Sequence, residues 1–462
     1  MSLIPVSRKR PVWFHRLRMS PAIVGAGTAA NSTAGPAISS SNAAAVGGQD
    51  QFGTEYENTG TGPMVAPTIP TTPSVSTYFG QLMCTNAQQP DPQQPAPDGC
   101  TRVFTLTAVQ FTQPIANFPM KTATVWGYQG EGLPAPSTPG PTLISYGGER
   151  VQIRETNKLP EPSTIHVHGL HQPNDADGVA GISQPTPIAV DQTFSYPAFV
   201  PGHVGTFSYH SHFDGAVQEQ RGLDGMWDVL PRQEHQSVKA DVDVNMTLQI
   251  FGWEKEGSLV QPFGTGVAKQ FPFDTINGKT GDASGGPITI KQGDRVRIRI
   301  YNASQQTHAM HLHGHDEVVV SKNGHAVPQV RETIQTVNPG DFYELEFTAN
   351  NPGSWIFHCH FPHHTANGMN SGYNGAPVGM TRIFHYQGAP DVPPPILQRR
   401  PLHVQDPQLS HPHTLHRSTI IYRNSPKGRR GRTVRRRSGP GVPLVVSRSG
   451  RGPRGGVRRR RR

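Results

Sequence analysis

Histidines separated by a single residue are the feature of this sequence most able to do chemistry. Random placement of 22 histidines among 462 residues gives about one His-x-His pair, whereas six pairs occur. On a β-strand, residues i and i+2 point to the same face, so a pair presents two imidazoles side by side. Such an arrangement suits metal binding. The six pairs are His166/His168, His210/His212, His311/His313, His313/His315, His358/His360 and His411/His413.

Four of these pairs recur at matching positions in two halves of the chain. Residues 148–154 (GERVQIR) precede the first pair, at 166/168, and residues 293–299 (GDRVRIR) precede the pair at 311/313. Each half then returns to a second pair, at 210/212 or 358/360. This repetition predicts a duplicated domain whose pairs serve one kind of site. For any single pair, and for the pair at 411/413 near the C-terminus, ordinary core or surface histidines remain the alternative.

Cys359 separates the two histidines of the last pair, so its thiolate is expected on the opposite face of the strand from both imidazoles. One strand would then serve two metal sites. A thiolate, two imidazoles and a weak thioether form the ligand set of an electron-transfer copper, and His308, His364 and Met369 stand where they complete it. A structural zinc site needs only four ligands and gains nothing from a methionine.

Strands are the elements expected to position these side chains. The 50 Gly and 45 Pro make up about a fifth of the chain, which favours many short strands joined by turns. Alternating segments occur at residues 101–107, 150–154, 164–168, 245–251, 295–301, 317–321, 342–347 and 355–358. Their spacing is typical of a sandwich or barrel. We predict an all-β protein with an N-terminal low-complexity arm at residues 1–99, β domains at 100–232 and 233–390, and a disordered Pro/Arg-rich tail at 391–462.

The positive charge of the chain lies in its tails. The net charge is +10, residues 399–462 hold 19 Lys or Arg against one acid, and residues 1–50 hold five against one. Removing the +18 and +4 of these segments leaves −12 for residues 51–398. Two interpretations of the Arg-rich tail stay open: binding of nucleic acid or another polyanion, or an extension whose composition carries no function.

The N-terminal segment resembles an export signal. Arg8-Lys9-Arg10 precedes a weakly apolar stretch at residues 21–30 and an Ala-rich segment ending near residue 46, an order similar to twin-arginine signals. We therefore expect a periplasmic or secreted protein. No run of about 18 apolar residues occurs, so no transmembrane helix is expected.

Three cysteines are too few for a fold built on disulfides. Cys84 and Cys100 flank a loop rich in Pro, Gln and Asp. In an oxidising compartment they could close this loop with a disulfide worth about 3 kcal/mol, and two free thiols are the alternative.

The histidine motifs resemble the four copper-binding motifs of multicopper oxidases. These motifs are residues 166–169 (HVHG), 210–212 (HSH), 308–315 (HAMHLHGH) and 358–364 (HCHFPHH) followed by Met369. The resemblance extends over residues 100–388 and includes Asp177-Gly178 and Gln184. It implies two cupredoxin-like Greek-key domains and about four coppers per chain, of types 1, 2 and 3. It implies type 1 ligands His308, Cys359, His364 and Met369, type 2 ligands His166 and His311, and type 3 ligands His168, His210, His212, His313, His358 and His360.

The resemblance also implies an activity and an assembly. A laccase-like oxidase would take one electron at a time from a small reducing substrate, such as a phenol or aromatic amine, and pass four electrons through Cys359 to dioxygen. Some relatives carry an acid after the last type 1 histidine, where this chain has Thr365, so proton delivery would rest mainly on Asp177. Residues 100–388 suffice for two domains, a pattern similar to two-domain laccases, whose cluster lies between the subunits of a homotrimer.

Three other functions stay open at this point. A metal oxidase acting on Mn(II), Fe(II) or Cu(I) would use the same scaffold, although no methionine-rich insert is present. A two-domain copper nitrite reductase would need fewer histidines, because it lacks the type 3 pair. A copper-sequestering protein would bind the metal without turnover.

Overall fold

The computed structural model describes residues 60–85, 90–117, 120–252, 257–261, 273–281, 283–365 and 379–390. Three predictions concern residues outside these ranges: the export signal, the Arg-rich tail at 391–462 and the copper ligand Met369. Among the described residues, no helix combines the length and the apolar character needed to cross a membrane.

The first domain consists of two packed β-sheets. One sheet contains, in spatial order, β2 (Thr77–Tyr78), β6 (Thr142–Tyr146), β11 (Asp224–Leu230), β10 (Gly205–His210) and β8 (His166–His168). The other contains β3 (Gln81–Cys84), β4 (Cys100–Asn117), β7 (Arg150–Asn157) and β9 (Thr193–Ser195), with β5 (Met120–Gly130) paired to β4. In β7, burial alternates residue by residue, because one face of the strand covers the core. Phe104 and Trp227 meet edge to face between the sheets, with ring centroids 5.2 Å apart.

The second domain repeats this architecture with a separate core. Its larger sheet contains β14 (Phe273–Ile276), β13 (Val242–Phe251), β16 (Arg295–Asn302), β21 (Phe342–Thr348), β18 (Glu317–Lys322) and β19 (His325–Glu332). The smaller contains β15 (Ile288–Ile290), β23 (Thr381–Tyr386), β22 (Ser354–Cys359), β17 (His308–Leu312) and β20 (Gln335–Val337). The prediction of an all-β protein with two cupredoxin domains is confirmed.

The predicted His-x-His motifs lie on or beside paired strands. In the first domain β8 runs antiparallel to β10, with His166 opposite His210. In the second domain β17 runs antiparallel to β22, with His311 opposite His358 and Met310 opposite Cys359. In both domains, therefore, neighbouring antiparallel strands bring histidines from distant parts of the sequence side by side.

A buried polar contact joins the two domains within the chain. Arg299 on β16 donates from Nη1 to Thr206 Oγ1 on β10 at 3.0 Å and to Glu344 Oε1 on β21 at 2.9 Å. Nearby, Asn245 Nδ2 donates to Asp228 Oδ2 at 2.6 Å. All five side chains are buried, so separating the domains would break the buried bonds of Arg299 to Thr206 and of Asn245 to Asp228.

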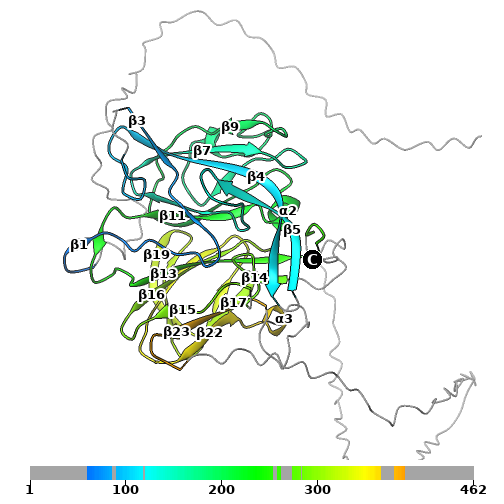
Figure 1. Cartoon of the computed structure of the whole chain (residues 1–462). Helices are drawn as coiled ribbons and strands as arrows, with labels where there is room; N and C mark the ends of the chain where they lie inside the picture. Colours follow the sequence, from blue (N-terminus) through cyan, green and yellow to red (C-terminus); the bar gives the residue numbers. More distant parts are fainter. Residues whose placement is uncertain are drawn as a thin grey trace, which may run out of the picture. The chain divides into compact units, whose positions relative to one another are not determined.

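Strands β4 and β5 form a long antiparallel hairpin (Figure 1). Its apolar residues Ile115 and Val125 pack into one buried cluster with Phe251 and Phe273 of the second domain. The backbone N–H of Thr280 also donates to the carbonyl of Ile115, at 2.9 Å. The hairpin is thus a second connection between the domains.

Order begins earlier than residue 100, the start that we predicted for the first domain. Three short strands precede it: β1 (Met64–Val65), paired with β12 (Glu234–His235), and β2 and β3 within the first domain's sheets. Tyr78 and Leu82 are buried there. Isolated apolar residues in a Pro-rich segment give no periodic signal, because these strands have only two to four residues.

Cys84 and Cys100 form a disulfide between the paired strands β3 and β4. The sequence had left this pairing open. Helical segments are limited, in the described ranges, to four short turns: η1 (Asn174–Ala176), α2 (Gly215–Gln218), η2 (Glu219–Arg221) and α3 (Pro362–Thr365).

Candidate metal centres

His308, Cys359 and His364 form a compact, buried group in the second domain, called here the mononuclear centre. Cys359 Sγ lies 3.8 Å from His308 Nδ1 and 3.3 Å from His364 Nδ1, and the two Nδ1 atoms are 3.2 Å apart. His308 comes from the start of β17, Cys359 from the end of β22 and His364 from α3. The structure thus brings together three of the four side chains predicted for a type 1 copper.

The outer nitrogens of both imidazoles have hydrogen-bond partners. Ser304 Oγ lies 2.7 Å from His308 Nε2, and Gln306 Oε1 lies 3.1 Å from His364 Nε2. Because Nε2 is held in each ring, Nδ1 is the nitrogen free to bind a metal. These partners fix the orientation of the rings toward the Cys359 sulfur.

The electrostatic environment of the mononuclear centre favours neutral side chains. Burial, together with the neighbouring imidazoles, lowers the pKa of His308 to about 3 and that of His364 to about 4. Burial raises the pKa of the Cys359 thiol to about 11. Metal binding would therefore release the thiol proton, while both imidazoles are already unprotonated at neutral pH. One sulfur and two nitrogens at this spacing fit copper.

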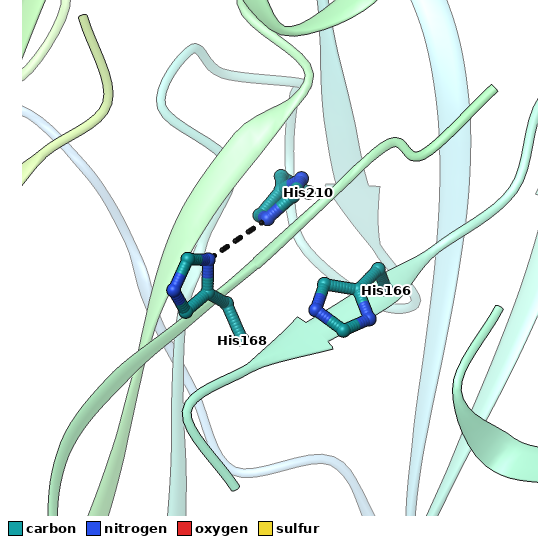
Figure 2. Close-up of side chains that lie close together, drawn as sticks. All are labelled: His166, His168 and His210. Carbon is teal, nitrogen blue, oxygen red and sulfur yellow. Dashed lines mark hydrogen bonds between the residues drawn. The ribbon is translucent and has the colours of Figure 1, made fainter. Parts of the chain in front are cut away.

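Four histidines of the first domain form a second group, the N-terminal half-cluster: His166, His168, His210 and His212. His168 Nδ1 and His210 Nε2 lie 3.2 Å apart, and Figure 2 shows the rings of His166, His168 and His210 close together beside β8 and β10. The possible ligand atoms of these three all lie within 4.8 Å of one another. The exposed His212 is next to them, with its ring centroid 5.4 Å from that of His166.

Two carboxylates touch the N-terminal half-cluster. Asp177 Oδ1 lies 3.2 Å from His166 Nδ1, and the Asp177 backbone carbonyl lies 2.8 Å from the same nitrogen. Glu219 Oε1 lies 3.1 Å from His210 Nδ1. Asp177 is itself held, because Gln172 and Ser183 donate to its two carboxylate oxygens at 3.0 and 3.1 Å. The sequence singled out Asp177 but not Glu219.

Burial and charge act differently on the three close imidazoles. Burial lowers the pKa of His168 to about 4 and also lowers that of His166, and neighbouring imidazoles add to both effects. Burial opposes protonation of His210 too, but the hydrogen bond and charge of Glu219 outweigh it and raise the pKa of His210. Because of Glu219, His210 is the only one of these three rings whose pKa is raised.

Four histidines of the second domain form the C-terminal half-cluster: His311, His313, His358 and His360. His313 Nε2 and His358 Nε2 lie 3.0 Å apart, and the ring centroids of His311 and His360 are 5.5 Å apart. Backbone carbonyls hold two of the rings: Thr333 O contacts His311 Nδ1, and Cys359 O lies 2.8 Å from His358 Nδ1. His313 and His360 are exposed.

The two half-clusters do not form one site within a single chain. Among the described side chains, the close groups of three possible ligands are His166/His168/His210 and His308/Cys359/His364, and neither combines histidines from both half-clusters. Each half-cluster also has exposed members. All eight histidines predicted for a three-copper cluster thus lie in two separate sets of four.

No sequence motif indicated the side chains that hold the predicted metal-binding residues in place. Ser304 and Gln306 precede His308 by four and two residues, and Glu219 follows His212 by seven. A polar run just before a buried histidine was the available signal for Ser304 and Gln306. The contact of Glu219 depends on how the chain turns after His212, which no motif revealed.

Known proteins are similar to this chain in both halves. The multicopper oxidase family matches it twice, over residues 111–234 and 255–377. Laccase-4 of Thanatephorus cucumeris is 29% identical over 282 residues, which cover 55% of this chain and 51% of that protein. A "Probable nitrite reductase-hydroxylamine oxidoreductase fusion protein" of Kuenenia stuttgartiensis is 28% identical over 248 residues, covering 53% of this chain and 28% of that protein.

A solved structure supports the same relationship. The multicopper oxidase mgLAC has a TM-score of 0.53 and 30% identity to this chain, covering 63% of it and 88% of mgLAC. The chain spans about half or less of the length of these two curated relatives. The family matches cover both domains and include all eight half-cluster histidines and the mononuclear centre. The chain belongs to the multicopper oxidase family.

Proposed function

We propose that this protein is a laccase-like oxidase that couples one-electron oxidation of a small reducing substrate to four-electron reduction of dioxygen to water. The observation that carries the proposal is the link through Cys359. Its sulfur belongs to the mononuclear centre, while its direct neighbours His358 and His360 belong to the C-terminal half-cluster. Copper, when bound, supplies the one-electron steps and the capacity to pass four electrons to dioxygen.

The chain's own residues have separate tasks in this proposal. Cys359 and its neighbours give electrons a short covalent route from the mononuclear centre to the cluster. Asp177, exposed over 28% of its side chain and 3.2 Å from His166, can hold a proton beside the cluster and exchange it with solvent. Dioxygen reduction consumes four protons, so such a group matters most in that half of the reaction.

We further propose that the cluster forms between subunits, with about four coppers per chain in a homotrimer. Each chain carries both half-clusters. Buried hydrogen bonds fix the two domains against each other in an arrangement in which the two half-clusters stay separate. Exposed apolar side chains flank both: Ile182 next to Ser183, the partner of Asp177, and Ile334 next to Thr333, the partner of His311. A head-to-tail contact that unites the two surfaces closes into a ring.

Complementation tests the proposed assembly. A His166→Ala/His168→Ala chain and a His311→Ala/His313→Ala chain should each be inactive. A productive interface needs the intact N-terminal half-cluster of one variant and the intact C-terminal half-cluster of the other. In an equal, random mixture about a quarter of the interfaces have this combination, so refolding the two variants together should recover about a quarter of wild-type oxygen consumption. Active monomers in light scattering, or no recovery although mass spectrometry shows mixed trimers, would contradict the model.

The electron donor is the finer part of the proposal, and phenols or aromatic amines are our first choice. Laccases among the relatives support this choice. Mn(II), Fe(II) and Cu(I) are the other donors to compare in one steady-state oxygen-consumption panel. Faster turnover of a metal ion than of every organic donor would replace a laccase with a metal oxidase.

A copper nitrite reductase is the second candidate, favoured by the similarity to the fusion protein of Kuenenia stuttgartiensis. Against it stand two sets of four histidines, more than that function requires. The copper-loaded protein, given a reduced dye, should consume dioxygen and leave nitrite unchanged. Nitrite consumption without oxygen consumption would reverse this assignment, and neither reaction would favour copper sequestration.

We propose that the protein works outside the cytoplasm. The Cys84–Cys100 disulfide supports an oxidising compartment, in agreement with the signal-like segment near Arg8-Lys9-Arg10. Fractionation of cells that produce the full chain should recover it in the periplasm or the medium. Recovery in the cytoplasm with both thiols reduced would argue against export.

A further inference from the structure

We propose that Glu219 is a positioning residue for the copper cluster: it fixes the ring of His210 so that Nε2, rather than Nδ1, is the ligand atom. The inference rests on the proposed copper-oxidase function and goes beyond it, because it adds an outer carboxylate that the motifs do not contain. Carboxylates that accept a hydrogen bond from a ligand histidine set its tautomer and make it a better metal ligand.

The geometry around His210 supports a single tautomer. Glu219 Oε1 lies 3.1 Å from Nδ1, and the Ser211 backbone carbonyl lies 3.0 Å from the same atom. Both are acceptors, so the proton belongs on Nδ1. The other nitrogen, Nε2, faces the cluster and lies 3.2 Å from His168 Nδ1. The His210 side chain is 8% exposed, so water cannot easily replace the carboxylate.

The turn that carries Glu219 is held by the residue before it. Gln218 is fully buried, and its Oε1 accepts hydrogen bonds from Ser211 Oγ at 2.6 Å and Ser163 Oγ at 3.1 Å. Its Nε2 donates to Glu161 Oε1 and to the Pro162 carbonyl, both at 2.9 Å. All hydrogen-bonding positions on the Gln218 amide are therefore used. Glu219 is presented to His210 from a fixed backbone rather than from a free loop.

The same arrangement occurs on the neighbouring ligand. His166 also has its Nδ1 within reach of a carboxylate, that of Asp177, and this leaves its Nε2 free. Two histidines of one half-cluster are thus oriented from outside by acids of two different segments. In the described contacts of the C-terminal half-cluster, backbone carbonyls have this role instead.

The test compares Glu219→Ala, which removes the acceptor, with Glu219→Gln, whose amide oxygen can still accept from Nδ1. Asp214→Asn is the matched control. It removes a charge at the start of the same turn, where Asp214 makes no capping hydrogen bond and has the left-handed backbone, φ 48°, that Asn tolerates. The full-length protein is loaded with Cu(II) and titrated with a chelator, and copper per chain and the visible colour of the mononuclear centre are measured.

We expect Glu219→Ala to lose cluster copper at a chelator concentration roughly 10- to 100-fold lower than wild type. Its mononuclear colour should stay, because that centre lies in the other domain. Glu219→Gln should keep most of the wild-type affinity, and Asp214→Asn all of it. Equal retention in Glu219→Ala and wild type would overturn the inference, as would equal losses in all three variants or parallel loss of colour. A wild-type protein that binds no copper would instead overturn the proposed function.

Discussion

The N-terminal and C-terminal half-clusters contain the same number of histidines but differ in what holds them. In the first, Asp177 and Glu219 contact His166 and His210, and three imidazoles converge within 4.8 Å. In the second, the described partners are backbone carbonyls and the other rings, and His313 and His360 are exposed. Within the single chain, the N-terminal half-cluster is therefore closer to a metal-binding arrangement than the C-terminal one.

Under the proposed function, this difference would divide the work between the half-clusters. The C-terminal half-cluster, whose His358 lies on β22 with Cys359, would receive electrons, and the N-terminal half-cluster, which carries the described carboxylates, would supply protons. An electron route needs only bonded neighbours, but proton supply needs titratable groups near solvent. Each half would then contribute what the other lacks.

The largest expected effect is on the visible colour of the copper-loaded protein, which should depend on Cys359 and not on the N-terminal half-cluster. Cys359→Ser should remove the blue absorption and reduce donor oxidation to background, because the colour arises from thiolate-to-copper charge transfer. His166→Ala should stop oxygen consumption and yet stay blue. Visible spectra of both copper-loaded variants decide this, and a colourless His166→Ala protein or a blue Cys359→Ser protein would show that the centres are assigned wrongly.

A substitution at Asp177 tests the proton side of the comparison. Asp177→Asn should slow reoxidation of the reduced protein by dioxygen roughly 100-fold, while reduction of the mononuclear centre by the donor changes little. Stopped-flow measurements follow the two half-reactions separately. Thr365→Asn, beside His364, is a useful control, since the Thr365 hydroxyl donates to the backbone carbonyls of Phe361 and Pro362. Equal slowing of both half-reactions in Asp177→Asn would rule out a role specific to protons.

The histidine spacing predicted which side chains lie close together, because strands fix side-chain direction every second residue. Four residues show this most clearly: His166 faces His210, and His311 faces His358, across antiparallel strand pairs. The spacing could not reveal outer contacts such as that of Glu219. Those depend on the turn at α2 and η2, and its conformation is set by the distant partners of Gln218 rather than by local sequence.

The short strands before residue 100 were not predictable for a related reason. β2 and β3 have two and four residues, so they carry no measurable periodicity, and they are ordered only because longer strands of the first domain pair with them. The long segments at 101–107 and 295–301 were predictable because alternation within a single segment reports its burial. Sequence patterns therefore miss short strands that are stabilised by pairing with distant strands rather than by their own sequence.

The acid stability of the copper-free protein gives a smaller effect that again separates the half-clusters. The pKa of His168 falls to about 4, from 6.5 in an unfolded chain. Between these pH values the unfolded chain binds a proton that the folded chain does not, so the free energy of unfolding decreases as pH falls, by up to about 3 kcal/mol. His168→Gln should flatten this decrease in urea titrations. His313→Gln should flatten it less, because His313 is exposed, and equal slopes for the two variants would remove the distinction.

The smallest expected effect concerns the apolar residues beside each half-cluster. Ile182 is 81% exposed in the single chain, and Ile334 is 39% exposed. If the two surfaces meet in the trimer, burying such a side chain contributes about 1 to 2 kcal/mol, so Ile182→Ser or Ile334→Ser should weaken subunit association roughly tenfold. Val190→Ser is the matched control, because Val190 is 42% exposed, similar to Ile334, and lies beside Asp191, the ion-pair partner of Lys158.

Sedimentation over a range of protein concentrations measures this effect directly. Copper content and oxygen consumption should fall together as the Ile182→Ser protein is diluted, since a cluster shared between subunits cannot survive their separation. The blue colour should remain at every dilution, because His308, Cys359 and His364 all belong to one chain. Dissociated subunits that still consume oxygen would show that a single chain can bring its own half-clusters together.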